Sequence, residues 1–554
     1  MSDFLPLQHR GKYTMRKNSI KIIAAFLAVV LTTSSCGTQQ TVQDPAQAQT
    51  EAAEVERNYD FTVSYDGIKK GNVSSGASVH DPSILKADGK YYIYGSHMSC
   101  ASCEDLKTWR FVADGYRQSN TVYGQIYDVY DEAFAYAGSP KSIIPTDNAK
   151  QGGEHVWAPD VIYNKAMGKY VMYYCTTSTW NASNLCYGIS DSPEGPFEWQ
   201  GALIYSGYDK ETIKATDILD YVSEDYALET YFKGDEYRFE DFPNAIDPAV
   251  FYDADGRLWM VYGSWSGGIF LLELDEKTGK VIHPAADPEN SVDPYYGKRL
   301  LGGGHNSIEG PYILWDEDSG YYYLFVSYGG LNRDGGYQIR VFRSERPDGE
   351  YVDMFGKKPE KGFNHAYFGL KLSGNYMLPS LSKAYMATGH NSALADDDGR
   401  KYVIYHTRFN DGSERHSPRV HQFIVNAEGW PCMLPYQTQG EKAAENGYSV
   451  QETAGRYYFI DQGTKIDGKI AEPVILYLND DGTAATEKSA GTWTITEGTC
   501  YMTLTLGDKT YSGVFCAMDD EGGNPVMTLS AVGYDESVWG VKYIGEAEQE
   551  KTSS

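Results

Sequence analysis

Three acidic residues and one histidine open similar segments that lie far apart in this chain. Each segment is predicted to be a β-hairpin, because a short apolar strand leads into a turn with DG, MG or SG and then into a strand of Tyr, Val, Ile and Trp. Aligned chiefly on the Pro or Gly that follows, the opening residues are Asp81, Ala158, Asp247, Glu309 and His390. If the five strands surround one axis, three carboxylates and an imidazole meet at its centre. Such a group could perform acid–base catalysis.

These acids also have an ordinary structural explanation. An Asp before Pro is common in turns, where its carboxylate caps backbone amides, so Asp81 or Asp247 taken alone would be a turn residue. Their equivalent places in separate segments, and the apolar residues beside them, favour a joint role instead. Acids that point into one channel repel each other, and this repulsion raises the pKa of at least one of them.

The repeated segments predict an all-β fold. They recur at intervals that leave room for about four strands each, roughly 60–90 residues, as in the blades of a β-propeller. Five blades would occupy residues 73–435. The remaining residues, 436–554, keep short alternating runs separated by Gly, Asp and Asn. We therefore predict a five-bladed β-propeller catalytic domain followed by a small C-terminal β-barrel or sandwich.

The N-terminal segment has the features of an export signal. Residues 1–36 hold a basic stretch that begins at Met15, which is the better start, an apolar run at 22–31 too short to span a bilayer comfortably, and small residues before Cys36. This pattern predicts a bacterial lipoprotein signal, and ordinary secretion with an incidental Cys is the alternative. Residues 37–72 are predicted to be a flexible tether and lead-in. We expect an exported protein that is anchored at the cell surface by a lipid, or otherwise secreted.

The amino-acid composition indicates which classes of ligand the protein could bind. The formal net charge of −28 argues against nucleic acid or an anionic membrane surface, and it favours a neutral or cationic ligand. The 47 tyrosines, in a chain that is 14% aromatic, could supply platforms that stack on the apolar faces of sugars. The alternative is that Tyr simply suits β-strands.

The eight cysteines indicate little chemistry. Cys100 and Cys103 form a lone CxxC without a second pair, so a zinc site is not expected. Cys175 and Cys186 fall on strands predicted to be neighbours and could pair. None of the cysteines resembles a nucleophile with a partner His.

A set of short motifs follows one order along the chain: HDPSI, HVWAPDV, AIDPAVF, YGSWSGGI, GGGHNSIEGPYI, SYGGLNRDGGYQIRVFRS, GHNSA and RVHQ. Together these motifs resemble glycoside hydrolase family 43, in particular its endo-acting α-1,5-L-arabinanases. The resemblance covers Val79 to Pro435. The trailing β-domain is similar to the one that longer, two-domain arabinanases carry.

The resemblance implies an enzyme that hydrolyses internal α-1,5-L-arabinofuranosidic bonds of arabinan, a side chain of pectin, with inversion at the anomeric carbon. By motif, Asp81 would be the general base that activates water, and Glu309 would be the general acid that protonates the leaving oxygen. Asp247 would orient that acid and adjust its pKa, because a negative charge beside Glu309 favours its protonated form. An inverting pair stands roughly 6.5–9.5 Å apart, and opposite walls of a propeller channel provide such a gap.

His390 has two interpretations. From the residues alone a hydrogen-bonded core histidine is the default, because calcium prefers oxygen ligands. The resemblance implies instead that the His of the GHN motif lies near the axis and ligates a metal, usually calcium, whose other ligands are largely water. His406, at the end of the next strand, is a competing candidate.

The resemblance also implies substrate contacts. Trp157 in HVWAPD, with Ser264 and Trp265 in YGSWSGG, match positions that line the sugar cleft, and His305 would lie at the rim. Each of these could instead be a core or loop residue. Trp109 is predicted to pack between blades.

The sequence is also compatible with other functions. A carbohydrate-binding lipoprotein could keep the propeller without chemistry, but its expected signature is the loss of Asp81 or Glu309. An exo-acting α-L-arabinofuranosidase or β-xylosidase could use the same scaffold, and the predicted insertion from Gly201 to Asn244 could form either a wall or part of the cleft. We expect a monomer.

Overall fold

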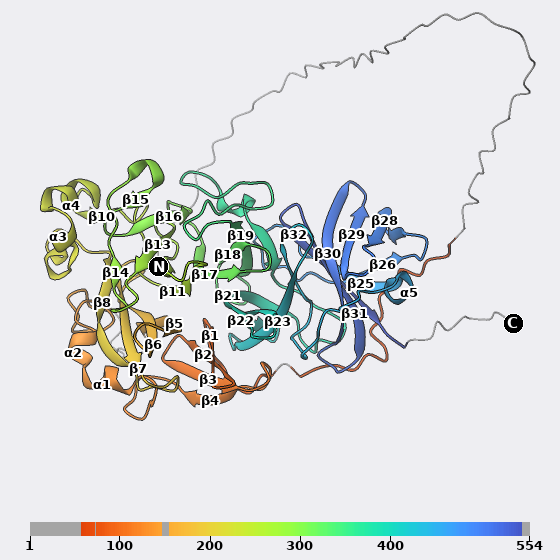
Figure 1. Ribbon diagram of the computed structural model, residues 1–554, viewed down its shortest axis with the longest axis horizontal. Coiled ribbons are helices and arrows are strands. Elements are labelled where there is room, and N and C mark those ends of the chain that lie inside the picture. The colour runs from red at the N-terminus through yellow and green to blue at the C-terminus, as the bar shows by residue number, and fades with distance from the viewer. Residues whose placement is uncertain (1–56, 73, 147–154, 546–554) are drawn as a thin grey trace, which may run out of the picture. The chain divides into compact units, whose positions relative to one another are not determined.

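The computed structural model describes residues 57–72, 74–146 and 155–545 (Figure 1). The chain divides into two compact units, 1–58 and 59–554, and nearly all the described residues belong to the second. The signal and Cys36 lie outside the described residues, as does the tether up to residue 56. Within the described ranges, no helix combines the length and the apolar character needed to cross a membrane.

Five antiparallel sheets follow one another along the chain and confirm the predicted five-bladed propeller (Figure 1). Blades 1 and 2 consist of β1 (Ser83–Ala87), β2 (Lys90–Gly95), β3 (Ser99–Cys103), β4 (Arg110–Ala113), β5 (Val156–Asn164), β6 (Lys169–Thr177), β7 (Ser183–Ser190) and β8 (Glu198–Ser206). Blade 3 consists of β11 (Ala249–Tyr252), β12 (Leu258–Tyr262), β13 (Ile269–Leu274), β14 (Val281–Ile282), β15 (Val292–Asp293) and β16 (Gly297–Leu301). Blades 4 and 5 consist of β17 (Ile308–Asp316), β18 (Tyr321–Tyr328), β19 (Gln338–Ser344), β20 (Leu370–Ser373), β21 (Tyr385–Ala395), β22 (Lys401–Phe409), β23 (Ser417–Val425) and β24 (Pro431–Met433).

The first strands of the blades form a closed ring. Strand β1 touches β5 and β21, while β11 touches β5 and β17, and β17 touches β21. Side chains seal the junction between blades 1 and 5, where Trp109 packs with Tyr402, Ile404 and Val420. This packing confirms the predicted structural role of Trp109. Because the first strands meet around one axis, residues that begin these strands face a common centre.

The DG turn of blade 1 forms as its residue types predict, whereas the DG segments of blades 3 and 5 lie in loops of five residues, 253–257 and 396–400. Ala87 pairs with Lys90 across the β1–β2 hairpin, so the loop is Asp88 and Gly89 alone. Both loop residues have positive φ, 50° and 74°, which is the conformation of the two-residue turn that Asp-Gly favours. Local turn chemistry therefore sets the register of this blade.

The C-terminal domain is a closed eight-stranded barrel, which decides between the predicted barrel and sandwich. Its strands, drawn in blue in Figure 1, are β25 (Gly455–Asp461), β26 (Val474–Leu478), β27 (Thr483–Thr486), β28 (Ala490–Ile495), β29 (Tyr501–Leu506), β30 (Lys509–Asp519), β31 (Pro525–Gly533) and β32 (Glu536–Tyr543). A one-turn helix, α5 (Val450–Thr453), precedes them with a capping box formed by Ser449 and Glu452.

The barrel packs on blades 4 and 5. One apolar core includes Phe325 and Leu372 of blade 4, Tyr405 of blade 5, and Val532 and Trp539 of the barrel. Hydrogen bonds cross the same boundary, from Ser537 Oγ to the Lys371 carbonyl at 2.7 Å and from Ser530 Oγ to the Met433 carbonyl at 2.8 Å. The barrel therefore supports the two blades that carry Glu309 and His390.

The segment between blades 2 and 3 is shorter than predicted at its start. Residues 201–206 belong to β8, so the insertion proper begins at Gly207. It contains η2 (Thr212–Ala215), α3 (Ile218–Tyr221), α4 (Glu224–Thr230) and a small hairpin of β9 (Phe232–Lys233) and β10 (Glu236–Tyr237). The remaining short helices are α1 (Gly124–Asp128), α2 (Tyr130–Ala133), η3 (Pro288–Asn290) and η4 (His365–Tyr367).

The considered pairing of Cys175 with Cys186 is not made, since both thiols are free. The two cysteines do lie on neighbouring strands, but Cys175 is opposite Leu185 and Cys186 is opposite Tyr174. This offset of one residue directs the two side chains to opposite faces of the sheet. Cys100 and Cys103 are likewise buried free thiols on β3.

Candidate active site

Four residues in or just before the first strands of the blades share an unusual backbone conformation. Asp81, Ala158, Asp247 and His390 have φ values of 54°, 40°, 56° and 46°. Residues other than glycine rarely adopt this left-handed region, at a cost of about 1–3 kcal/mol each, and such strain clusters at functional sites. The repeated conformation confirms that these four positions are equivalent in four blades.

The predicted alignment is wrong in blade 4. There the left-handed residue is Gly310, with φ of 56°, and it precedes Pro311 as Asp81 precedes Pro82. A Cβ atom on Gly310 would lie 3.1 Å from Cγ of the His390 ring, so a glycine leaves room for the imidazole. Glu309 therefore stands one residue earlier than predicted, and its side chain leaves the backbone from a different position than that of Asp81.

Asp81 is held as a carboxylate just before β1, the first strand of blade 1. Its Oδ2 lies 2.7 Å from His80 Nδ1 and accepts a hydrogen bond from Ser96 Oγ, while its Oδ1 lies 3.1 Å from His390 Nδ1. Burial by itself raises the pKa of Asp81, but the neighbouring His390 and His80 imidazoles overcome it and hold this pKa well below its usual range. A buried carboxylate that stays ionised meets the electrostatic requirement for a general base.

His406 contacts the backbone of Asp81 and the ring of its neighbour His80. It is fully buried, and burial lowers its pKa well below the usual value, so its imidazole is neutral. Its Nδ1 accepts a hydrogen bond from the Asp81 backbone N–H at 3.3 Å, and its ring stacks on His80 at 4.1 Å between centroids. His406 thus positions the strained backbone of the candidate base.

Glu309 accepts hydrogen bonds from three side chains. Ser264 Oγ and Trp265 Nε1 donate to its Oε2 at 3.1 Å and 2.6 Å. The hydroxyl of Tyr337 donates to its Oε1 at 2.7 Å. Burial, together with the charges of Glu309 and Asp81, raises the pKa of Tyr337 well above its usual value, so this hydroxyl stays protonated. The three donors fix both oxygens of the Glu309 carboxyl group.

Asp247 lies beside both acids. Its Oδ2 accepts a hydrogen bond from the backbone N–H of Gly310 at 3.1 Å, and this bond fixes the peptide next to Glu309. Burial and the negative charges of Glu309 and Asp81 raise the pKa of Asp247 to about 7, although His390 opposes the shift. Below that pH, therefore, the acids retain a proton in the folded protein.

His390 lies between the acids at the axis. Its Nδ1 faces Asp81, and its pKa is raised because Asp81, Asp247 and Glu309 outweigh the opposing effect of burial. His390 also lines a cavity of about 20 Å³, together with residues in or just before the first strand of every blade: Asp81, Pro82, Ser83, Ala158, Pro159, Asp160, Asp247, Pro248, Ala249, Pro311, Tyr312, Asn391 and Ser392. This volume is enough for a water molecule or a single ion.

The residues around this cavity fit a hard cation. Asn391 Oδ1 is buried without a hydrogen-bond partner among the described residues, and Asp81, Asp160 and Asp247 line the same cavity. Oxygen atoms and negative charge are the environment that calcium prefers. Among the described residues, a different set, His80, Asp81 and His406, brings its possible metal-ligand atoms within 4.8 Å of one another. That set is the hydrogen-bonded shell of Asp81 described above.

The four predicted substrate contacts have different surroundings. Ser264 and Trp265 contact Glu309 directly, and the Trp265 ring lies 5.5 Å from that of His305. His305 is exposed, as expected for a rim position. Trp157 is partly exposed and packs against the core shared by blades 2 and 3.

Sequence reasoning missed three residues that hold the acids. Tyr337 lies within the motif SYGGLNRDGGYQIRVFRS, and His80 opens HDPSI, but neither motif shows which atom the side chain will meet. Ser96, whose hydroxyl bonds Asp81 and also accepts from the Ala158 N–H at 2.9 Å, follows β2 without any distinguishing pattern. Only the adjacency of His80 to Asp81 was a usable signal.

Comparison with known proteins is consistent with this geometry. Residues 236–431 match glycosyl hydrolases family 43, and residues 435–540 match a C-terminal lipocalin-like domain of that family. The chain is 37% identical over 500 residues to an extracellular endo-α-(1→5)-L-arabinanase of Bacillus subtilis, across 87% of this chain and 96% of the relative.

Solved structures are similar over the same extent. A family 43 glycoside hydrolase of Bacillus licheniformis is 36% identical, with a TM-score of 0.72, across 85% of this chain and 99% of the other. The endo-1,5-α-L-arabinanase of Thermotoga petrophila is 35% identical with the same TM-score of 0.72, across 86% of this chain and 100% of the other. Each similarity spans both the propeller and the barrel.

Proposed function

The chain belongs to glycosyl hydrolases family 43, and we propose that it cleaves internal α-1,5-L-arabinofuranosidic bonds of arabinan with inversion of configuration. The observation that carries the proposal is the contrast between two buried acids at one centre. The pKa of Asp81 is held well below its usual range, while that of Asp247, beside Glu309, is raised to about 7. Environments that push the pKa values of neighbouring carboxyl groups apart keep one of them ionised while a proton is retained at the other, and both states are needed in one centre for acid–base catalysis.

In the proposed reaction, Asp81 removes a proton from a water molecule as that water attacks the anomeric carbon. Its ionised form is available because the His390 and His80 imidazoles hold its pKa low. Glu309 donates its proton to the oxygen of the leaving sugar. Ser264, Trp265 and Tyr337 keep the Glu309 carboxyl group in one orientation while the proton moves.

Asp247 acts in this scheme through Glu309. It fixes the neighbouring peptide through Gly310, and the charge of Glu309 is one of the causes that raise the pKa of Asp247. Below about pH 7, Asp247 therefore holds a proton beside Glu309. Asp247 is accordingly a positioning residue and not the proton donor itself.

Digestion of debranched, linear arabinan tests the function directly. We expect oligosaccharides of mixed length early in the reaction, because an endo-acting enzyme cleaves within the chain, and chromatography of the products measures this. Proton NMR before mutarotation should show the β anomer first, since water attacks opposite the α-linked leaving group. Early release of arabinose alone would indicate exo action. An α product would mean a glycosyl-enzyme intermediate and would remove Asp81 from the role of base.

We further propose that one calcium ion binds at the axis through His390, with Asn391 lining the same cavity. When bound, the cation would add positive charge near the three acids. The support is the oxygen-rich, acidic lining of the cavity and the partnerless Oδ1 of Asn391 within the described residues.

Thermal unfolding tests the calcium site. A chelator should lower the melting temperature and added calcium should restore it, because a ligand that binds only the folded protein stabilises it, by about 2.7 kcal/mol at a hundredfold excess over Kd. His390→Ala should abolish the response to calcium, whereas His406→Ala should keep much of it. If the wild type ignores both reagents and elemental analysis finds no metal, His390 is only a hydrogen-bonded core residue.

We propose export as well, in line with the extracellular relatives. A lipid on Cys36 would then anchor the enzyme, as a monomer, near polymeric substrate outside the cell. Mass spectrometry of the mature N-terminus decides this, since an unmodified Cys36, or a cleavage site beyond it, would exclude the lipid anchor.

A further inference from the structure

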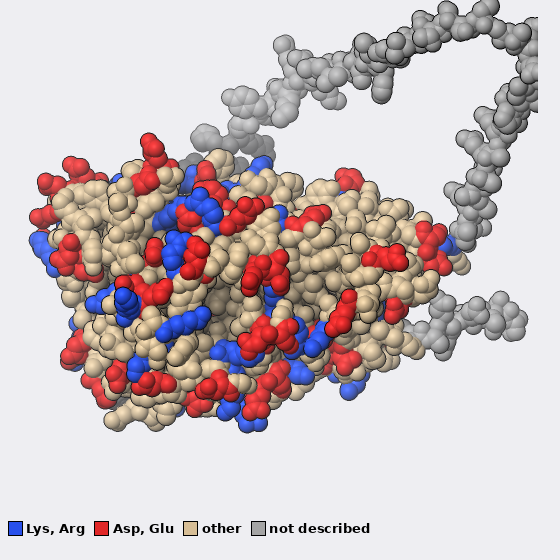
Figure 2. All heavy atoms as spheres, in the orientation of Figure 1, with Lys and Arg blue, Asp and Glu red and all other residues tan. Residues whose placement is uncertain are grey.

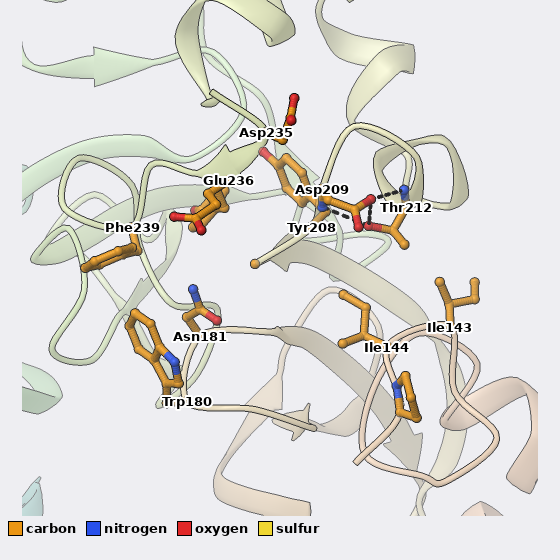
Figure 3. Close-up of a pocket in the computed structure, with 13 residues that line it drawn as sticks. Ile143, Ile144, Trp180, Asn181, Tyr208, Asp209, Thr212, Asp235, Glu236 and Phe239 are labelled. Atoms are coloured by element: carbon orange, nitrogen blue, oxygen red, sulfur yellow. Dashed lines mark hydrogen bonds between the residues drawn. The ribbon is translucent and has the colours of Figure 1, made fainter. Parts of the chain in front are cut away.

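A second cavity lies beside the insertion between blades 2 and 3. It has a volume of about 500 Å³, within the usual range for ligand pockets. Three segments line it: the loop at Ile143–Pro145, the β6–β7 turn at Trp180 and Asn181, and the insertion from Gly207 to Phe239. In Figure 3, Trp180 and Phe239 lie together at one end of the cavity, and Ile143 and Ile144 lie at the other.

A row of rings joins this cavity to the catalytic centre. Trp265, which donates to Glu309, lies 5.5 Å from His305, and His305 lies 5.3 Å from Trp180. Trp180 in turn meets Phe239 edge to face at 4.8 Å. Successive neighbouring rings therefore connect Glu309 with the cavity.

Trp180 is exposed in spite of its size. Its relative exposure is 57%, whereas Trp109 and Trp539 are buried in cores. A large exposed aromatic side chain beside a cavity is the kind of surface on which sugars stack.

The polar lining suits a neutral, hydroxyl-rich ligand. Asp235 and Glu236 of the β9–β10 hairpin and Asn181 of the turn surround the cavity, as Figure 3 shows. Carboxylates accept hydrogen bonds from hydroxyl groups but repel phosphate or uronate. Figure 2 shows Asp and Glu side chains interspersed with Lys and Arg side chains on one face of the molecule.

Hydrogen bonds hold the segments that line the cavity in position. The Tyr208 and Tyr296 hydroxyls meet at 2.8 Å, and the Tyr237 hydroxyl donates to the Pro243 carbonyl at 2.8 Å. The Asn244 amide donates to the Trp180 carbonyl at 3.0 Å. These bonds hold the insertion and the Trp180 turn in place before any ligand arrives, which lowers the entropic cost of binding.

From this arrangement we propose that the cavity is a distal subsite for the arabinan chain, with Trp180 as its stacking platform. The inference rests on the proposed function, because it assigns the cavity to the same polysaccharide that the acids cleave. It explains the insertion between blades 2 and 3 as part of the substrate path rather than a wall that blocks it.

The test compares arabino-oligosaccharides of increasing length with linear arabinan. Trp180→Ala should lower kcat/KM about tenfold on polymer and long oligosaccharides, the equivalent of about 1.4 kcal/mol for one lost aromatic contact, and should leave the shortest substrates unaffected. Trp180→Phe should keep most of the activity on polymer. Phe111→Ala is the matched control, because Phe111 is similarly exposed at 61% but lies on β4.

Two outcomes would overturn the subsite: no loss on any substrate, or an equal loss at every length. If the wild type cleaves no arabinan at all, the proposed function fails, and affinity electrophoresis in arabinan then decides the subsite separately. Retardation that Trp180→Ala abolishes would support the subsite. Absence of retardation, or retardation by xylan in place of arabinan, would refute it.

Discussion

Glu309→Ala is expected to lower kcat/KM on linear arabinan by about 10²- to 10⁴-fold, the usual contribution of a general acid. The sugar alkoxide that leaves during hydrolysis is a poor leaving group, and Glu309 is the acid whose three donors hold it in place. An activated aryl α-L-arabinofuranoside needs little protonation, so its hydrolysis should be largely spared. Steady-state kinetics on both substrates measure the difference.

Glu441→Ala is the matched control, because Glu441 is also a buried glutamate that accepts side-chain and backbone hydrogen bonds, but from Thr438 and Gln439. It should leave activity on arabinan unchanged. Near-normal rates for Glu309→Ala on arabinan, with an unchanged pH profile, would mean that another group donates the proton.

The pH dependence of kcat/KM is a second test of Glu309 as the general acid. Burial and the neighbouring acids raise the pKa of Asp247 to about 7, so the wild-type kcat/KM should fall as pH rises through about 7 and Asp247 loses its proton. On the acidic side the pKa of Asp81 is well below its usual range, so the base stays ionised and the rate should persist. Glu309→Ala, assayed on the aryl substrate, should lack the alkaline fall.

Asp81→Gly is expected to lower activity on arabinan by a comparable factor, about 10²- to 10⁴-fold, because no other group would activate the attacking water. Glycine is the informative replacement, since φ at this position is 54° and glycine adopts that conformation without strain. Azide should restore part of the rate by entering the space that the carboxylate leaves, and the glycosyl azide should have the β configuration.

The control for this variant is Asp88→Gly. Asp88 has nearly the same φ, 50°, but lies in the exposed β1–β2 turn, so its replacement should not change activity. Full activity of Asp81→Gly in the absence of azide would refute the role of base. Loss of activity in Asp88→Gly of similar size would show that changes in this blade act through the fold.

Much of this protein is determined by residues that are neighbours in sequence. Alternation of apolar residues around Asp88 and Gly89 predicts a hairpin, because turn chemistry and strand periodicity depend on a few adjacent residues. Five such segments predict five blades, and the ordered motifs around Asp81, Asp247 and Glu309 predict the acids. The fold class and the identities of the candidate catalytic residues could therefore be predicted from the sequence.

The tertiary structure alone decided how those acids are held. Glu309 is one residue away from the position that alignment predicted, because Gly310 must leave space for the His390 ring from another blade. Its donors Trp265 and Tyr337 lie 44 and 28 residues away in the chain, so no local pattern connects them to it. The subsite at Trp180 depends in the same way on ring contacts between separate loops. Contacts of this kind depend on strand register and on packing between blades, and both are set only when the ring of blades closes.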